Sequence, residues 1–526
     1  MSIKNGNPTM RKTKILWTDD EIEALKPYIL FLQEKGYDID TCTNGIDTLD
    51  LVRINRYDLI FLDENMPGIS GIETLKLIKE IRTDIPVVMV TNSDEEELME
   101  AAIGSEIADY LIKPVKPRQV LLVVKKILDQ RRLITEKTTT DYQQEFSRIS
   151  NMISSASTFD DWTELYRKIV FWESELEKST DPGMAEILKD QENQANNSFS
   201  RFMINNYLNW LKPENTNKPV LSPALLSKKV FPQISDNKPL FFILIDNMRF
   251  DQWKTIYNEL TGLFRLIDED LYFSILPTST QFSRNSIFAG LMPSEIVRTM
   301  PKLWINDDEE EGKNMFEEEL FQSQLDRRRL KYKWSYNKIS SGSEGKKLNE
   351  KVKSLLGNDI NILVFNFVDM LSHARTDVKL IRDLANDERA YRSLTRSWFA
   401  HSSLFELLRI LADHPVRVVF STDHGTIRVQ NPVKIIGDRN TSPNLRYKMG
   451  RNLDYDAKKV FELKDPEKAM LPKTNISSRY IFALNKDFLI YHNNFNYYAG
   501  YYKDTFQHGG ISMQEIMLPV AFLEPV

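Results

Sequence analysis

The sequence has little of what secreted and membrane proteins need. It contains a single cysteine, Cys42, so no internal disulfide can form and a reducing, cytoplasmic setting is expected. Its longest apolar runs, such as PLFFILI at 239–245, fall far short of the roughly 18 residues of a membrane-spanning helix. No apolar segment of the secretory type follows the N-terminal basic residues. We therefore expect no membrane insertion.

An excess of charge of one sign is also lacking. The net charge is only −6, which argues against non-specific coating of nucleic acid. Histidine is rare, with 6 residues in a chain of 526. The length exceeds the roughly 250–300 residues at which a single hydrophobic core stops growing. Two or three domains are therefore expected.

Residues 12–126 alternate short apolar runs with amphipathic stretches, which predicts a doubly wound α/β domain with a parallel sheet. The predicted strands are 14–17, 38–42, 58–62, 86–90 and 108–112. In such sheets, functional sites lie at the carboxyl ends of the strands.

Polar side chains stand at those strand ends. Asp19 and Asp20 follow the first strand, and Asp63 follows the third. Neighbouring carboxylates would repel one another without a cation, and an all-oxygen site suits Mg²⁺. Thr91 and Lys113 end the fourth and fifth strands, where a hydroxyl and an ammonium group would stabilise a phosphoryl group carried on one carboxylate.

This pattern resembles the receiver domain of bacterial response regulators, which has a flavodoxin-like fold. The resemblance is carried by the acidic pair, by DENMPG opening on Asp63, by Thr91 and by YLIKP. It implies that Asp63 is phosphorylated, that the acidic pair and Asp63 hold Mg²⁺, and that Thr91 and Lys113 contact the phosphoryl group. It also implies that Tyr110 reorients on activation and that a sensor histidine kinase is the partner.

Residues 127–213 have few strand signals, and their apolar residues recur at helical spacing. One such stripe comprises Trp162, Leu165, Tyr166, Ile169, Trp172 and Leu176. Because nothing in this part carries chemistry, we expect a helical bundle that acts as a connector. It shows no compact helix-turn-helix with a basic recognition helix, so no sequence-specific DNA binding is expected.

Residues 214–526 return to alternating strands and helices, which predicts a second, larger α/β domain. The expected strands are 239–245, 271–276, 361–368, 416–421, 479–484 and 519–523. Candidate ligands and nucleophiles follow most of them or lie near the C-terminus: Asp246, Thr278, Thr280, Asp369, His373, Asp423, His424 and His508.

Asp423 and His424 taken alone fit a simple turn, but the recurrence of such residues at strand ends favours metal binding. Mixed carboxylate and imidazole ligands suit Zn²⁺ or Mn²⁺. Two such groups sharing one crevice suit a two-metal site. The remaining histidines, His401, His414 and His492, have no strand-end carboxylate nearby and are expected to be ordinary surface or core residues.

The order of these residues resembles the alkaline phosphatase superfamily, and in particular the PglZ domain family. The resemblance implies two zinc ions. One would be held by Asp246, Asp423 and His424. The other, which activates water, would be held by Asp369, His373 and His508.

The stretch TQFSRNSIFAGLMP resembles the nucleophile loop of related hydrolases, and HGGISMQEIMLPV resembles the C-terminal signature of PglZ domains. In those hydrolases the nucleophile stands ten residues before a glycine of this loop, and Thr280 has that spacing to Gly290. The resemblance therefore implies that Thr280 is the nucleophile, in contact with one metal ion. Thr278 is predicted instead to cap the helix that follows.

Several basic residues are weaker candidates for binding substrate phosphates. Arg284 lies in the nucleophile loop. The stretch RNTSPNLRYKMGR contributes Arg439, Arg446, Lys448 and Arg451. For this second group, a solvated loop is the favoured interpretation.

The order of receiver, helical connector and PglZ domain resembles the PorX-type response regulators, which are linked to type IX secretion in Bacteroidetes. We expect phosphorylation of Asp63 to control homodimerisation and a zinc-dependent phosphodiesterase. The alternative is a non-catalytic regulator that binds a sigma factor or a secretion-motor component, with a structural metal site. The substrate stays open among monoesters, linear or cyclic diesters and sulfates. A threonine nucleophile favours nucleotides or oligonucleotides as the substrates.

Overall fold

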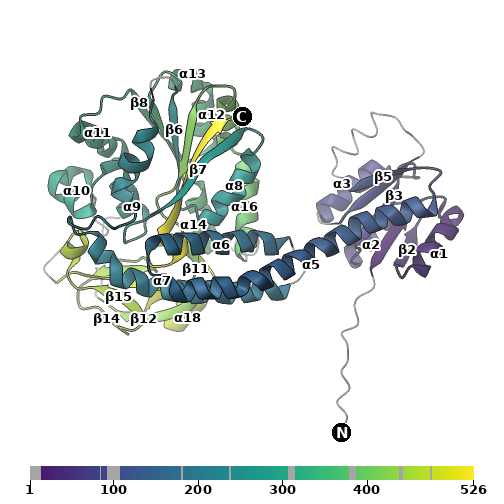
Figure 1. Cartoon of the computed structure of the whole chain (residues 1–526), viewed down its shortest axis with the longest axis horizontal. Coiled ribbons are helices and arrows are strands. Elements are labelled where there is room, and N and C mark those ends of the chain that lie inside the picture. The colour runs from purple at the N-terminus through teal and green to yellow at the C-terminus, as the bar shows by residue number, and fades with distance from the viewer. Residues whose placement is uncertain are drawn as a thin grey trace, which may run out of the picture. The chain divides into compact units, whose positions relative to one another are not determined.

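The structure is a computed structural model, and it describes residues 13–82, 85–91, 107–178, 182–235, 238–305, 314–377, 387–437, 442–473 and 477–526. The chain forms two compact units (Figure 1). The first comprises residues 1–142 and 178–182, and the second comprises residues 143–177 and 183–526.

The first unit contains a five-stranded parallel sheet in the order β2-β1-β3-β4-β5. The strands are β1 (Lys14–Thr18), β2 (Asp38–Cys42), β3 (Leu59–Asp63), β4 (Val87–Thr91) and β5 (Asp109–Ile112). This is the flavodoxin-like order, and all five predicted strands are confirmed. The residues of β3 are all buried because hydrophobic layers cover both faces of the sheet.

Helices surround this sheet. They are η1 (Ile22–Leu25), α1 (Lys26–Glu34), α2 (Gly45–Ile54), α3 (Gly71–Ile81) and α5 (Pro117–Ser155). The last of them begins in the first unit and, from residue 143 onward, belongs to the second.

Two long helices, α6 (Phe159–Glu177) and α7 (Pro182–Trp210), follow α5. The predicted apolar stripe is confirmed, since its six residues are all buried on α6. Both helices belong almost entirely to the same compact unit as the C-terminal domain. Polar contacts join them to it, such as the ion pair between Arg167 and Glu269 at 2.8 Å.

The core of the second unit is a six-stranded mixed sheet in the order β7-β19-β10-β6-β9-β8. Its strands are β6 (Leu240–Ile245), β7 (Phe264–Phe273), β8 (Trp334–Ile339), β9 (Ile360–Phe365), β10 (Arg417–Ser421) and β19 (Met517–Pro525). Strands β10, β6, β9 and β8 are parallel, whereas β19 runs antiparallel to both of its neighbours. Every residue of β6 and β9 is buried, as expected for central strands.

Three predicted strands of this domain differ from the structure. The strand expected at 271–276 is part of β7, which begins at Phe264 and ends at Phe273. The strand expected at 361–368 is β9, which ends at Phe365 because a helix begins at Phe367. The strand expected at 479–484 is formed but belongs to a small sheet. The small sheets contain β11 (Ile427–Arg428), β12 (Asn431–Ile436), β13 (Tyr447–Gly450), β14 (Asp454–Tyr455), β15 (Val460–Leu463), β16 (Arg479–Ala483), β17 (Asp487–Tyr491) and β18 (Phe506–Gln507).

Helices flank the main sheet and fill the connections. They are α8 (Phe250–Leu260), α9 (Thr280–Ala289), α10 (Pro293–Thr299), α11 (Glu317–Arg328), α12 (Gly342–Glu350), α13 (Val352–Leu355), α14 (Phe367–Asp377), α16 (Glu388–Ala400), α17 (Ser403–Ala412), α18 (Phe495–Tyr502) and α19 (Met513–Ile516). Within the described part of the chain, none of the helices is long and apolar enough to cross a membrane.

Candidate phosphorylation and metal sites

The first candidate site lies at the carboxyl ends of β1 and β3. Asp19 and Asp63 are buried, Asp20 is exposed, and ligand oxygens of all three lie within 4.8 Å of one another. Nζ of Lys113 lies 2.9 Å from Oδ2 of Asp19 and 2.9 Å from Oδ1 of Asp63. One ammonium therefore binds two of the three carboxylates.

Burial sets the electrostatics of this site. It raises the pKa of Asp63, and the charges of Asp19 and Asp20 add to the shift, while Lys113 opposes it. For Lys113, burial alone would lower the pKa, but its bonds to Asp63 and Asp19 outweigh burial and raise it. The excess of negative charge and the all-oxygen donors fit a bound Mg²⁺ ion.

The remaining receiver residues lie at neighbouring positions of the sheet. Thr91 is the last residue of β4, next to β3, and is partly buried. Tyr110 is on β5 and is 40% exposed.

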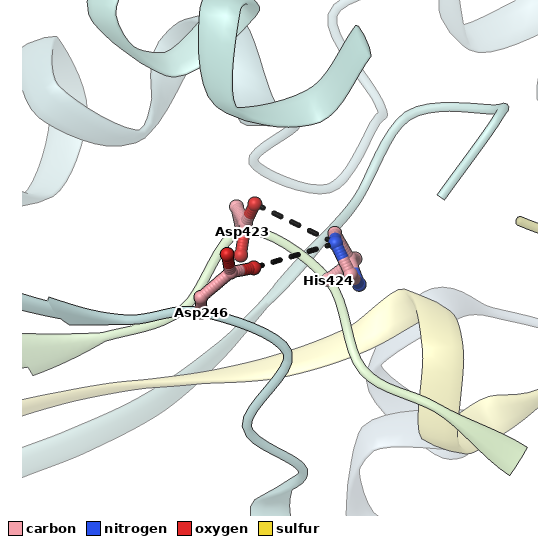
Figure 2. A group of neighbouring side chains, drawn as sticks. All are labelled: Asp246, Asp423 and His424. Carbon is pink, nitrogen blue, oxygen red and sulfur yellow. Dashed lines mark ion pairs between the residues drawn. The ribbon is translucent and has the colours of Figure 1, made fainter. Parts of the chain in front are cut away.

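The second candidate site lies at the ends of two adjacent parallel strands. Asp246 follows β6, and Asp423 and His424 lie just beyond β10. All three are buried, and both carboxylates face the imidazole, with 3.6 Å from Nε2 of His424 to an oxygen of each (Figure 2). The adjacency of the strands explains why residues so distant in the sequence meet here.

Thr280 completes this group. Its Oγ1 lies 3.0 Å from Nε2 of His424 and 3.5 Å from Oδ1 of Asp246. Thr280 is the first residue of α9, so it stands where backbone N–H groups of a helix N-terminus point outward.

Arg284 lies one turn further along α9 and is fully buried. Its guanidinium forms ion pairs with Asp246, with Asp423 at 3.0 Å and with Glu317 at 3.3 Å. The sequence-based suggestion that Arg284 binds substrate therefore needs correction, because this side chain is occupied in holding the two carboxylates.

The two carboxylates differ in their electrostatics. Burial raises the pKa of Asp246, and Asp423 and Asp369 add to the shift, although Arg284 opposes it. For Asp423, burial is outweighed by Arg284 and His424, so its pKa is lowered. Asp246 is thus a buried carboxylate with incomplete charge compensation. Together with its neighbours it offers two carboxylates and one imidazole, which fits Zn²⁺.

The second set of predicted ligands lies beside the first. The ring of His508 stacks on that of His424, with centroids 4.2 Å apart. Nε2 of His508 lies 3.8 Å from Oδ1 of Asp369, which is in the first turn of α14. His373 is on the same helix, but its side chain lies outside the described part of the structure.

Thr278 does not cap α9, contrary to prediction. Ser279 is the N-cap residue and makes no side-chain cap bond. The buried hydroxyl of Thr278 accepts a hydrogen bond from the N–H of Gly509 and donates one to the carbonyl of Gly510, both at 3.0 Å. Thr278 therefore anchors the segment that carries His508.

Of the other predicted basic residues that the structure describes, two are held by groups of the protein itself. Arg446 is buried and forms a two-pronged ion pair with Glu515, at 2.7 and 3.0 Å. Lys448 is buried and donates to two backbone carbonyls at 3.1 Å. Arg451 is exposed, and Arg439 lies outside the described residues. The favoured solvated-loop interpretation is wrong for the two buried side chains.

Asn247 also belongs to the site, although the sequence did not single it out. This residue has a positive φ of 63°, and its Nδ2 donates to Asp369 at 3.1 Å and to Ser372 at 3.1 Å. It therefore joins the two ligand sets. Two features of the sequence could have pointed to Asn247. It directly follows Asp246, and asparagine tolerates the left-handed backbone conformation of a tight turn.

Family models match three consecutive parts of the chain. Residues 15–125 match the response regulator receiver domain, and residues 132–211 match the PorX response regulator linker domain. Residues 225–522 match the BREX system PglZ alkaline phosphatase-like domain.

Individual relatives each match about a quarter of the chain. Transcriptional regulatory protein ResD of Bacillus subtilis is 34% identical over 142 residues, which are 26% of this chain and 59% of ResD. A CpxR homolog of Haemophilus influenzae is 35% identical over 118 residues, 22% of this chain and 50% of the relative. The chain thus spans between half and two thirds of the length of these curated relatives.

Solved structures of receivers also match. A CheY-like receiver domain protein from Methanospirillum hungatei has 25% identity, covering 23% of this chain and 95% of that chain, with a TM-score of 0.22. A two-component response regulator from Clostridium difficile has 34% identity, covering 22% and 97%, with a TM-score of 0.22.

Proposed function

The chain belongs to the family of the BREX system PglZ alkaline phosphatase-like domain, in the PorX-type order of receiver, linker and PglZ domain, and we propose that it is a phosphorylation-controlled, zinc-dependent phosphodiesterase. The observation that carries this proposal is the position of Thr280. Its hydroxyl is within 3.5 Å of two predicted zinc ligands, Asp246 and His424.

We assign each residue of the site a role in the reaction. Asp246, Asp423 and His424 would hold one zinc ion, and Asp369, His373 and His508 would hold the other. When bound, the zinc ions supply positive charge that offsets the phosphate and activates the attacking oxygen. Thr280 Oγ1 attacks phosphorus and displaces one alcohol, which leaves with a proton. Water then cleaves the phosphothreonine.

The surrounding residues prepare this site. Arg284 holds Asp246 and Asp423 in place, and the hydroxyl of Ser274 donates to the carbonyl of Asp423 at 2.9 Å. The hydroxyl of Thr422 receives a bond from the N–H of Met248 at 3.0 Å. The turns after β6 and β10 are thus tied to each other, which keeps the ligand atoms at fixed separations.

The substrate class that we propose is a nucleotide-like phosphodiester, such as an oligonucleotide. A threonine nucleophile at a helix N-terminus suits a phosphoryl group, because helix N–H groups bind anions. We propose further that phosphorylation of Asp63 by a sensor kinase promotes a homodimer, and that the output serves type IX secretion, a role suggested by the resemblance of the domain order to the PorX-type regulators.

A panel of chromogenic monoesters and diesters, including a bis(nitrophenyl) phosphate, tests this function with zinc-loaded full-length protein. We expect hydrolysis of the diesters, and we expect it to depend on zinc. A zinc-loaded, folded protein that hydrolyses none of the panel would contradict the proposal and favour a non-catalytic regulator that binds a sigma factor or a secretion-motor component.

A further inference from the structure

Helix α7 presents a row of buried polar residues. Glu192, Asn196 and Ser200 follow one another at four-residue spacing, so they share one face of the helix. Their exposed fractions are 3%, 0% and 3%. Buried polar side chains are costly unless they are hydrogen-bonded, so their partners show what this face of the helix holds.

Hydrogen bonds join this face to residues 511–514, and Glu192 also forms an ion pair with Lys486 at 3.8 Å. Asn196 donates through Nδ2 to Oε1 of Gln514 at 3.0 Å and accepts through Oδ1 from the N–H of Met513 at 2.8 Å. Nε2 of Gln514 donates to Oε1 of Glu192 at 2.6 Å. The helix therefore holds both the backbone and a side chain of this segment.

Residues 511–514 belong to a longer segment, residues 508–515, which carries His508 and is called the His508 segment below. This segment reaches the ligands of the proposed metal site. The N–H of Gly425, next to His424, donates to the carbonyl of Glu515 at 3.3 Å. A Cβ atom on Gly425 would lie only 2.0 Å from the carbonyl oxygen of Gln514. Because no space separates these backbones, a shift of the segment must also shift the two histidine-bearing turns.

The neighbouring residue on α7 contacts another helix of the linker. Nε2 of Gln191 donates to the carbonyl of Phe146 at 2.9 Å and to Oγ of Ser150 at 2.8 Å. Phe146 and Ser150 are on α5, the helix that follows β5 of the receiver in the chain. Adjacent residues of α7 thus bind α5 and the His508 segment.

We infer that Asn196 and Glu192 are positioning residues through which the linker sets the geometry of the His508 segment, so that the state of the receiver regulates the hydrolase site. This inference rests on the proposed function, since it names how that site is regulated. Coupling of this kind requires a chain of packed or hydrogen-bonded groups, and the contacts of Gln191, Glu192, Asn196 and Gln514 supply one.

Hydrogen exchange of the peptide 508–515 in the full-length protein, with and without Mg²⁺ and beryllofluoride, tests the inference. In the wild type, we expect the addition of Mg²⁺ and beryllofluoride to change the rate of hydrogen exchange in this peptide. In Asn196→Ala, we expect about tenfold faster exchange without the ligand, because the bond to the Met513 amide is lost. We also expect the response to beryllofluoride to disappear. Asn197→Ala is the matched control, because Asn197 is exposed on the same helix and contacts only Asn485 in the hydrogen bonds of the described residues.

A wild-type peptide that does not respond to beryllofluoride, or an Asn196→Ala peptide that responds fully, would overturn the inference. If circular dichroism shows that Asn196→Ala is unfolded, Gln514→Ala takes its place, because it removes the side chain that faces Asn196. We expect the Gln514→Ala peptide to lose its response to beryllofluoride, and a full response would overturn the inference. The test separates the two proposals. A responding segment in a protein without hydrolase activity would overturn only the function, and a silent segment in an active enzyme would overturn only the inference.

Discussion

The hydroxyl of Thr280 lies 3.0 Å from Nε2 of His424, although the two residues are 144 positions apart in the chain. The start of α9 and the turn after β10 bring them together, and Arg284 on α9 binds Asp423 next to His424. This relationship joins the candidate nucleophile to the candidate metal ligands.

Asp63 should control the receiver and the oligomeric state. With Mg²⁺ and beryllofluoride, we expect the wild type to shift towards a dimer and Asp63→Ala to stay unchanged, because the mimic binds the carboxylate of Asp63. Asp50→Ala, an exposed acidic residue on α2, is the control and should behave as the wild type. Light scattering measures the mass. A wild-type mass that is identical with and without the mimic would refute the switch, whereas a partial shift would still agree with a two-state equilibrium.

Zinc content should follow the two ligand sets. We expect two zinc ions per chain in the loaded wild type, and a loss of about one in His424→Ala and about one in His508→Ala. His492→Ala, at an exposed position, should retain both. Elemental analysis after reloading and desalting measures this. Metal-free wild type that gains no zinc on addition would rule out the site.

Arg284→Met should act on stability and metal binding. Removing the guanidinium leaves Asp246 and Asp423 buried without their partner, and we expect a loss of about 3–5 kcal/mol in unfolding free energy without zinc. Added zinc should restore part of the loss. Denaturant unfolding with and without zinc measures both, and Arg298→Met, at an exposed position on α10, is the control. A variant with normal stability and only a raised KM would show that Arg284 binds substrate after all.

Thr278→Val should weaken the His508 segment. The change leaves the N–H of Gly509 and the carbonyl of Gly510 without their buried partner. We expect this to lower the free energy of unfolding by about 1–3 kcal/mol. Because His508 is carried by the same segment, we expect a lower zinc affinity as well, and activity that recovers when excess zinc is added. Unchanged stability together with unchanged zinc affinity would show that the bonds of Thr278 have no such role.

Acid should abolish the contribution of Asp251 to the free energy of unfolding. This carboxylate is buried against Arg249 and Arg392. Burial would raise its pKa, but the two guanidinium groups outweigh burial and lower it. A lowered pKa contributes stability that is complete above the unfolded value, about 3.9, and is lost as pH falls through the folded value. Chemical unfolding of Asp251→Asn should therefore show a deficit of about 3–5 kcal/mol at neutral pH that shrinks below about pH 4. A deficit that stays constant down to pH 2 would contradict this assignment.

Much of the fold, and the positions of the candidate ligands, could be predicted from the sequence because they depend on local patterns. The buried strand β3 reads as an apolar run that ends on Asp63, and β10 reads as one that is followed closely by Asp423 and His424. Carboxyl ends of neighbouring parallel strands meet, so ligands at those ends could be grouped without a structure.

The rest depends on contacts between distant segments. Nothing local distinguishes Arg284, which holds two carboxylates, from an arginine that binds substrate. The roles of Thr278 and Asn196 follow from contacts with residues 509–514, more than 200 positions away in the chain. Such partners emerge only when the sheet order and the position of α7 are known.

The most direct measurement of the central claim is the steady-state rate of zinc-loaded Thr280→Val on an activated phosphodiester, with Thr299→Val as the control. Thr299 is an exposed residue at the end of α10, so its change removes a hydroxyl of the same kind outside the site. We predict that Thr280→Val loses nearly all activity while its fold and the response of Asp63 to beryllofluoride stay intact, and that Thr299→Val keeps the wild-type rate. A folded, zinc-loaded Thr280→Val with a rate near that of the wild type would contradict the claim that Thr280 is the nucleophile.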